Sequence, residues 1–152
     1  MALSDEIKST KFESFRSKAI INLFYTANYF RDLHKGVFKK FNLLPQHFNA
    51  LRIINGRYPD PISPGEIKEV MIDKAPDVTR LVDKLVSMEL VNRCQNQDNR
   101  RVMEIRISDQ GQKLLQEMNE EIDAMTAENF KLTEKEAEQL SDLLDQSRNS
   151  KT

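Results

Sequence analysis

The clearest pattern in the chain is a hydrophobic stripe with a helical period at residues 76–87. Its apolar positions follow one another at steps of three and four residues, which predicts an amphipathic helix with one face against a core. They are Val78, Leu81, Val82, Leu85 and Val86. The opposite face begins with Thr79 and Arg80, whose side chains can reach base edges or phosphates. This is a candidate recognition helix, although an ordinary solvated face has the same composition.

A second, shorter helix is predicted just before it. Ser63 is suited to be its N-cap, Pro64 its first residue and Glu66 the reciprocal partner of a capping box. Residues 72–75 form a short break, and Pro76 restarts a helix with its φ already set. Two helices joined by so short a turn are expected to cross steeply.

The period then changes from 3.6 to 2 in two short segments. Residues 91–94 and 102–107 alternate, and Met103, Ile105 and Ile107 fall on one face. The polar residues 95–101 between them include Arg100 and Arg101. This predicts a β-hairpin with a basic tip. The paired arginines are either solubilising residues or contacts to a narrow, A·T-rich minor groove.

The ordered set of these segments resembles the MarR family of winged helix-turn-helix transcriptional regulators. The matching runs are P-Q-x-F-x-x-L-R-I-I, S-P-G-E-I, V-T-R-L-V-D-K-L, E-L-V-x-R, D-N-R-R and I-S-D-Q-G-Q-K-L-L. Together they cover the chain from Pro45 to Leu115 without an obvious gap. One departure is Leu44, which precedes Pro45 where the family usually has Ser or Thr and which cannot cap a helix with its side chain.

The resemblance implies a homodimer with a recognition helix in the major groove and a wing arginine in the minor groove. It draws the major-groove residues from Asp77, Thr79 and Arg80. It makes Asp98, Arg100 and Arg101 the wing residues, with Asp98 bracing the loop or an arginine rather than touching DNA. Further phosphate contacts are expected from lysines of the central segment, if these share a surface with the wing. They are Lys74 and Lys84.

Helices are predicted on both sides of this module. Residues 5–42 read as one long helix or two collinear ones, and residues 45–55 as another, with Gly56 as its left-handed C-terminal residue. After the wing, Ser108 caps a helix running to about Phe130, and Thr133 opens a last helix by a T-x-x-E capping box. Residues 146–152 carry no apolar side chain and are expected to fray.

The predicted fold is therefore mainly α with a small β-hairpin wing. It forms a single domain over residues 1–152, with a winged helix DNA-binding module at residues 45–107. Residues 5–42 and 108–146 form a helical dimerisation region, because their apolar surface exceeds what one copy is expected to bury.

The aromatic first helix suggests an effector site. Tyr25 and Tyr29, with His47 and Arg52 of the following helix, could hold a small aromatic or phenolic compound. Plain core and dimer packing explains the same residues more simply.

Charge and composition narrow the choice of function. The net charge is −1, and residues 57–107 hold nine basic and nine acidic residues, so only their arrangement could make a positive face. Cys94 is the one cysteine, and as a small half-buried strand residue it needs no redox role. No nucleophile motif or metal-ligand spacing occurs, so we expect no enzyme, no cofactor and no metal. A cytoplasmic protein without membrane contact is expected, because neither a signal peptide nor a span of roughly 20 apolar residues is evident.

The sequence therefore favours a DNA-binding regulator, acting chiefly as a repressor on a pseudo-palindromic operator and released by a small molecule. The rival is a winged-helix protein-interaction or effector-binding module without an operator. Sequence-selective, salt-dependent DNA affinity separates the two.

Overall fold

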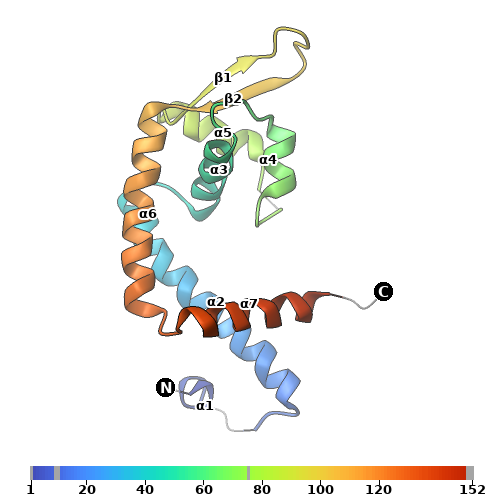
Figure 1. The fold of residues 1–152 in the computed structure, drawn as a ribbon, viewed down its shortest axis with the longest axis vertical. Helices are drawn as coiled ribbons and strands as arrows, with labels where there is room; N and C mark the ends of the chain where they lie inside the picture. The colour runs from blue at the N-terminus through green and yellow to red at the C-terminus, as the bar shows by residue number, and fades with distance from the viewer. Residues whose placement is uncertain (1, 9–10, 75, 150–152) are drawn as a thin grey trace.

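The computed structural model describes residues 2–8, 11–74 and 76–149 (Figure 1). Its elements follow one another in the order helix, hairpin, helix that the sequence predicted. They are α1 (Leu3–Glu6), α2 (Phe15–Lys40), α3 (Pro45–Gly56), α4 (Pro64–Val70), α5 (Val78–Ser87), β1 (Val91–Gln95), β2 (Met103–Ile107), α6 (Asp109–Asn129) and α7 (Glu134–Arg148). The mainly α fold with a small hairpin is thus confirmed.

The hairpin is antiparallel and is extended by a short third segment. Val91 pairs with Ile107 and Gln95 with Met103. Ile62 joins through two backbone bonds: its N–H donates to the Ile105 carbonyl (3.0 Å), and its carbonyl accepts the Ile105 N–H (2.9 Å). This bridge ties the segment before α4 to the wing, and the sequence pattern gave no sign of it.

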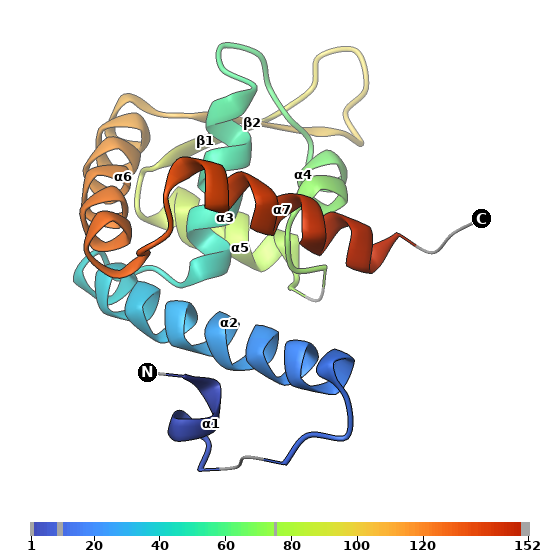
Figure 2. The same cartoon turned by 60° about the horizontal axis from the view of Figure 1, so that its bottom comes forward.

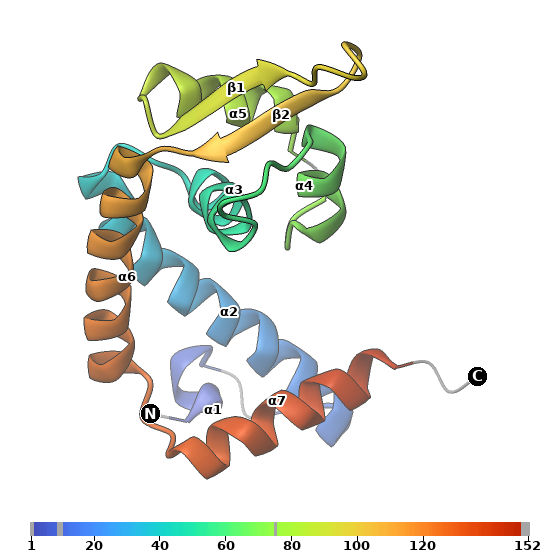
Figure 3. The ribbon, with the colours of Figure 1, turned by 45° about the horizontal axis from the view of Figure 1, so that its top comes forward.

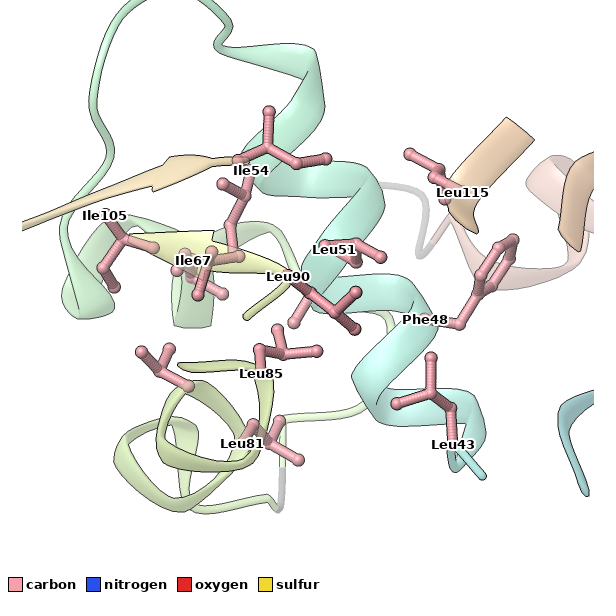
Figure 4. Packing of buried hydrophobic residues seen from close by; sticks show 14 of the residues in the cluster. Leu43, Phe48, Leu51, Ile54, Ile67, Leu81, Leu85, Leu90, Ile105 and Leu115 are labelled. Carbon is pink, nitrogen blue, oxygen red and sulfur yellow. The ribbon is translucent and has the colours of Figure 1, made fainter. Parts of the chain in front are cut away.

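One hydrophobic core lies among α3, α4, α5, the hairpin and the start of α6 (Figure 4). Leu51 and Ile54 of α3, Ile67 of α4 and Leu85 of α5 point into it and are almost completely shielded from solvent. The alternation predicted for the second strand is also confirmed, since Ile105 and Ile107 are buried.

The α6 helix connects this core to the other end of the molecule (Figure 1). As predicted, Ser108 caps it, and its hydroxyl accepts the Gly111 N–H (3.0 Å) while donating to the Glu89 carbonyl (2.6 Å). Gly111 lies so close to the Leu90 carbonyl that a Cβ built there would be 2.0 Å from the oxygen. The first turn of α6 is therefore seated directly on the end of the helix-turn-helix.

The N-terminal helix starts later than the sequence suggested. Ser14 ends an irregular stretch and caps α2, with its hydroxyl accepting the Ser17 N–H (3.1 Å). The four-residue α1 is a separate element, and Lys8 has a left-handed φ of 52°, which breaks a continuous helix. The prediction of a helix from residue 5 is wrong in this respect. Residues 9–10 lie outside the described part of the chain.

Three smaller predictions about helix ends also need correction. Gly56 is the last residue of α3 and has no positive φ, because the Arg57 N–H closes the end on the carbonyls of Ile54 and Asn55. Asp77, not Pro76, immediately precedes α5. The last helix continues to Arg148, so residues 146–148 are helical; residues 150–152 are outside the described part.

Both α2 and α7 extend away from α6 (Figures 2 and 3). The predicted capping box at Thr133 is confirmed, but α7 contains no buried residue. Its Leu143 is 61% exposed, and Phe24 of α2 is 65% exposed. None of the helices in residues 2–8, 11–74 and 76–149 combines the length and apolar character that a membrane span requires.

Candidate nucleic-acid interface

The α5 helix is held by its apolar face and offers a polar one. Val82 and Leu85 are buried in the core, as the stripe predicted, whereas Thr79, Arg80 and Asp83 are exposed. With its backbone fixed from behind, the helix can present its first turn to a partner. Thr79 and Arg80 therefore stand where the recognition-helix interpretation needs them.

Asp77 has a structural role at the start of this helix. Its carboxylate accepts the Arg80 N–H (3.3 Å) and so satisfies one of the donors left free at the N-terminus. A capping carboxylate is poorly placed to read a base at the same time. The prediction that Asp77 contacts DNA is not tested by this geometry, but helix capping already accounts for the residue.

The turn between α4 and α5 carries Lys74. Its ammonium donates to the carbonyls of Glu69 and Lys68 at the end of α4 (3.3 Å to Lys68). This contact offsets the negative end of the helix dipole. Lys74 is exposed beside α5, and a phosphate would have to compete with these carbonyls for its donors.

The wing projects beyond the helices as a polar loop (Figure 1). Its shape is fixed by two asparagines. The Asn96 amide oxygen accepts the N–H groups of Asp98 (2.9 Å) and Asn99 (2.8 Å), and the Asn99 oxygen accepts the N–H of Arg101 (3.2 Å). The other end of the Asn96 amide donates to Glu104 (2.6 Å) in the second strand. Such bonds order a loop that has no apolar core.

The prediction that Asp98 braces this loop is therefore wrong in the described structure. The bracing acceptors belong to Asn96 and Asn99, while the Asp98 side chain is exposed. Arg100 and Arg101 are exposed on the same loop. The sequence held a signal for the correct arrangement, since asparagine in a polar hairpin loop is a common side-chain acceptor for backbone N–H groups two and three residues ahead.

An ion pair links the recognition helix to the wing. The Arg93 guanidinium of β1 bonds to the Asp83 carboxylate of α5. This pairing makes Arg93 a poorly available phosphate contact, because its charge is already partnered. It also connects the two elements that carry the candidate DNA contacts.

Cys94 is exposed, not half-buried as expected. It lies on the outer face of the hairpin, where its sulfur is 4.0 Å from a Glu104 oxygen and 3.9 Å from an Arg106 nitrogen. Of the residues of β1, Val91 is buried in the core and the other four are exposed. A two-stranded hairpin that packs one face on the core leaves its other face open to solvent.

Lys84 lies one turn beyond Arg80 on the same side of α5, because residues four apart are neighbours on a helix surface. It lines a cavity with His47 at the junction of α2, α3 and α5. His47 is 9% exposed, and its Nδ1 accepts the Leu44 N–H (3.0 Å), which is the reciprocal bond of a capping box from the third helical residue to the N-cap backbone. The His47 pKa is lowered, mainly because the ring is buried and to a lesser degree because the charge of Lys84 is near.

The four residues suggested for an effector site do not meet in one place. The Tyr25 hydroxyl donates to Glu6 (3.0 Å) and that of Tyr29 to Asn129 (3.2 Å), whereas the Arg52 guanidinium lies 5.8 Å from the centre of the Phe48 ring. Of the four, His47 lines the cavity described above. Within the described residues, no group of three or more His, Cys, Asp or Glu side chains is placed to hold a metal ion.

A helix-turn-helix with a polar first turn and an arginine-bearing hairpin defines a winged helix-turn-helix protein. Residues 43–103 match the model of the MarR family. The resemblance found in the sequence is thereby confirmed, since this part of the chain and its solved structural neighbours are similar to MarR-family transcription regulators.

Individual relatives agree with this family. An uncharacterized HTH-type transcriptional regulator, YpoP of Bacillus subtilis (strain 168), is 32% identical over 73 residues, which are 48% of this chain and 50% of that protein. The chain thus matches only half the length of this curated relative.

Solved structures extend the likeness to most of the chain. A MarR transcription factor from Planctomyces limnophilus is 28% identical, with a TM-score of 0.69 over 90% of this chain and 98% of the other. A mutant MarR from E. coli complexed with operator DNA has a TM-score of 0.69 at 22% identity, covering 98% of this chain and 100% of that one. At that identity the second likeness concerns the fold alone.

Proposed function

We propose that this chain is a transcription regulator of the cytoplasm that binds double-stranded DNA as a homodimer and acts chiefly as a repressor. The observation that carries the proposal is the first turn of α5, where Thr79 and Arg80 are exposed on a helix whose other face is locked in the core. A helix held in this way can enter a major groove without losing its own packing.

The wing supplies the second contact of this proposal. Arg100 and Arg101 sit on a loop ordered by asparagine hydrogen bonds, so they can reach phosphates or a minor groove from a defined position. Lys74 adds a cation near the turn before α5. The operator-bound MarR of E. coli, which shares the fold, supports this use of the module.

Dimerisation follows from the apolar surface of the helical ends. Phe15, Phe24 and Leu143 are among large side chains that remain more than half exposed in the single chain. Such surface favours association with a second copy. Two-fold symmetry would place the recognition helices roughly 34 Å apart on a pseudo-palindromic site. Release by a small-molecule effector is part of the proposal, because a ligand that favours another spacing lowers DNA affinity.

The first test is fluorescence anisotropy with DNA from the region upstream of the protein's own gene and with scrambled DNA, at two salt concentrations. We expect selective binding that weakens steeply with salt. Arg80→Ala should weaken specific binding by about 1–3 kcal/mol. Arg100→Ala should lower the affinity for both DNAs and reduce the slope of log affinity against log salt concentration by about 1. The matched control is Lys113→Ala, an exposed cation of α6 that should leave both unchanged.

A second candidate function is an interaction or effector-binding module without an operator. The equal numbers of acidic and basic residues in positions 57–107 favour it. Weak, equal binding to both DNAs by a protein that sediments as a dimer would support this alternative. Unchanged binding in both arginine variants would show that the assigned DNA contacts are wrong.

The dimer has its own test in sedimentation. Phe24→Asp places a charge on the exposed apolar face of α2, so we expect the protein to sediment as one chain where the unmodified protein sediments as two. Lys113→Gln lowers the charge on α6 by the same one unit and should remain a dimer. A monomeric unmodified protein would remove the dimer from the proposal.

A further inference from the structure

A cavity of about 490 Å³ lies where α2 ends, α3 begins and α5 passes. Its size is that of sites for small organic ligands. The apolar part of its lining includes Phe38, Leu43 and Pro45, and the polar part includes three lysines. The cavity therefore joins an apolar wall to a group of cations.

The charges around this cavity are unbalanced. Lys35, Lys39 and Lys84 line it, and no carboxylate does. Lys35 is neutralised by Asp32 at 2.7 Å. Across the part of the chain that the structure describes, neither Lys39 nor Lys84 forms an ion pair. In a chain with a net charge of −1, two uncompensated cations thus face one cavity.

His47 adds a neutral donor to these cations. Its Nδ1 accepts the Leu44 N–H, so the neutral ring carries its proton on Nε2. In the described residues no fully buried side-chain nitrogen lacks a partner, so Nε2, for which no bond is found, keeps access to solvent, and His47 is one of the residues that line the cavity. A side chain that is 91% buried thus presents an unused N–H donor to the cavity.

These donors fit one class of anion better than others. A phosphomonoester carries about −1.5 to −2 charges at pH 7 and has three acceptor oxygens. It can balance the positive charges of Lys39 and Lys84 and still accept a hydrogen bond from the Nε2–H of His47. A carboxylate has one charge and two oxygens, so it leaves one cation unbalanced. The apolar wall would receive the organic part of the ligand.

We propose that this cavity binds a small organic phosphomonoester, held by Lys39, Lys84 and His47. Lys39 belongs to α2 and Lys84 to the recognition helix α5, so a bound phosphate bridges the two. This regulatory consequence rests on the proposed DNA-binding function. The ligand site itself does not.

The test uses phenyl phosphate as the probe and benzoate as the comparison, at equal ionic strength and without DNA. The chain has two histidines, so nitrogen NMR can follow each separately. We expect phenyl phosphate to shift the His47 signals more than those of His34, whose Nδ1 is 2.7 Å from the Phe30 carbonyl oxygen and whose ring stacks on Phe38 of the cavity wall. Phenyl phosphate should bind about tenfold or more tightly than benzoate.

Matched glutamine variants assign the contacts. Lys39→Gln and Lys84→Gln should each weaken phenyl phosphate by about tenfold, because each removes one charge-assisted bond. Lys113→Gln should bind phenyl phosphate with unchanged affinity. Both lysines of the site are at least partly exposed, so the variants are expected to fold, and circular dichroism checks this.

Three results would overturn the site. Benzoate binding as tightly as phenyl phosphate would refute the ligand class. Unchanged affinity in both lysine variants would place the probe elsewhere. Absence of probe binding, with weakened DNA binding in Lys39→Gln and Lys84→Gln, would show that these lysines meet DNA phosphates instead. Selective DNA binding measured separately on the unmodified protein keeps this outcome distinct from failure of the proposed function.

Discussion

The winged-helix core and the helical ends of this molecule bury their apolar residues to very different degrees. In the core, Leu51 and Ile105 are fully shielded by neighbours from the same chain. In α2 and α7, Phe24 and Leu143 remain largely exposed although both helices are regular and well capped.

The difference teaches that helix formation and helix burial have separate causes here. Capping and periodicity suffice to define α7, yet it contributes no buried residue. Its stability must come from elsewhere, since isolated helices of about 15 residues are marginal in water. A second copy of the chain is the partner we propose, and identical substitutions in the two regions can test this contrast.

The largest contrast is expected for leucine truncation. Leu51→Ala should lower the free energy of unfolding by about 2–5 kcal/mol, because it leaves a cavity in a close-packed core. Leu143→Ala should change the folding of a single chain by less than about 0.5 kcal/mol. Urea unfolding measures both, and sedimentation shows whether Leu143→Ala weakens the dimer. Equal losses in a monomeric protein would remove the contrast.

Glycine replacement gives the next largest effect. Gly111→Ala should destabilise the protein by about 3 kcal/mol, because its Cβ would collide with the Leu90 backbone carbonyl. The matched Gly36→Ala in α2 meets open space and should stabilise its helix by about 0.5–1 kcal/mol. Thermal unfolding would report both. A neutral Gly111→Ala would mean that α6 can move away from the core.

Removal of the two capping hydroxyls should have a smaller, unequal effect. Ser63→Ala should cost about 1 kcal/mol of global stability, because α4 is packed in the core. Thr133→Ala breaks the same kind of box, but in α7 it should increase only local amide exchange in a single chain. Hydrogen exchange should be measured at low and high protein concentration. If the dimer depends on α7, the Thr133→Ala variant should lose global stability at high concentration, and not only show faster exchange within α7.

The smallest effect concerns acid. The Ser63 backbone N–H, and then its hydroxyl, lower the Glu66 pKa by bonding to the charged carboxylate. Because the folded-state pKa lies below the unfolded one, this contribution is present above the usual glutamate pKa and is lost as pH falls through the folded-state pKa. Glu66→Gln should therefore reduce the loss of stability between neutral pH and about pH 3. The same slope in both proteins would contradict the assignment.

Features set by neighbouring residues were predicted well from the sequence. The stripe of Val78 to Leu85, the boxes at Ser63 and Thr133, and the cap at Ser108 depend on contacts within four residues along one helix. Local spacing is enough to specify such contacts. The exposed position of Thr79 and Arg80 follows directly from the same period.

Features that depend on distant residues were missed. The exposure of Cys94 follows from a hairpin with one covered face, and the closeness of Gly111 to Leu90 follows from the seating of α6. The predicted grouping of Tyr25, Tyr29 and Arg52 with His47 failed because the tyrosines bond to α1 and α6. No spacing along the chain encodes these partners.

By itself, then, the sequence determined the order and type of the elements, the helix caps and the polar face of the recognition helix, because these arise from local backbone and side-chain preferences. Only the tertiary structure decided which charged groups converge. Lys39 and Lys84 are far apart in the chain and meet His47 at one cavity because α2, α3 and α5 pack around a shared core. Packing, rather than periodicity, brings such groups together.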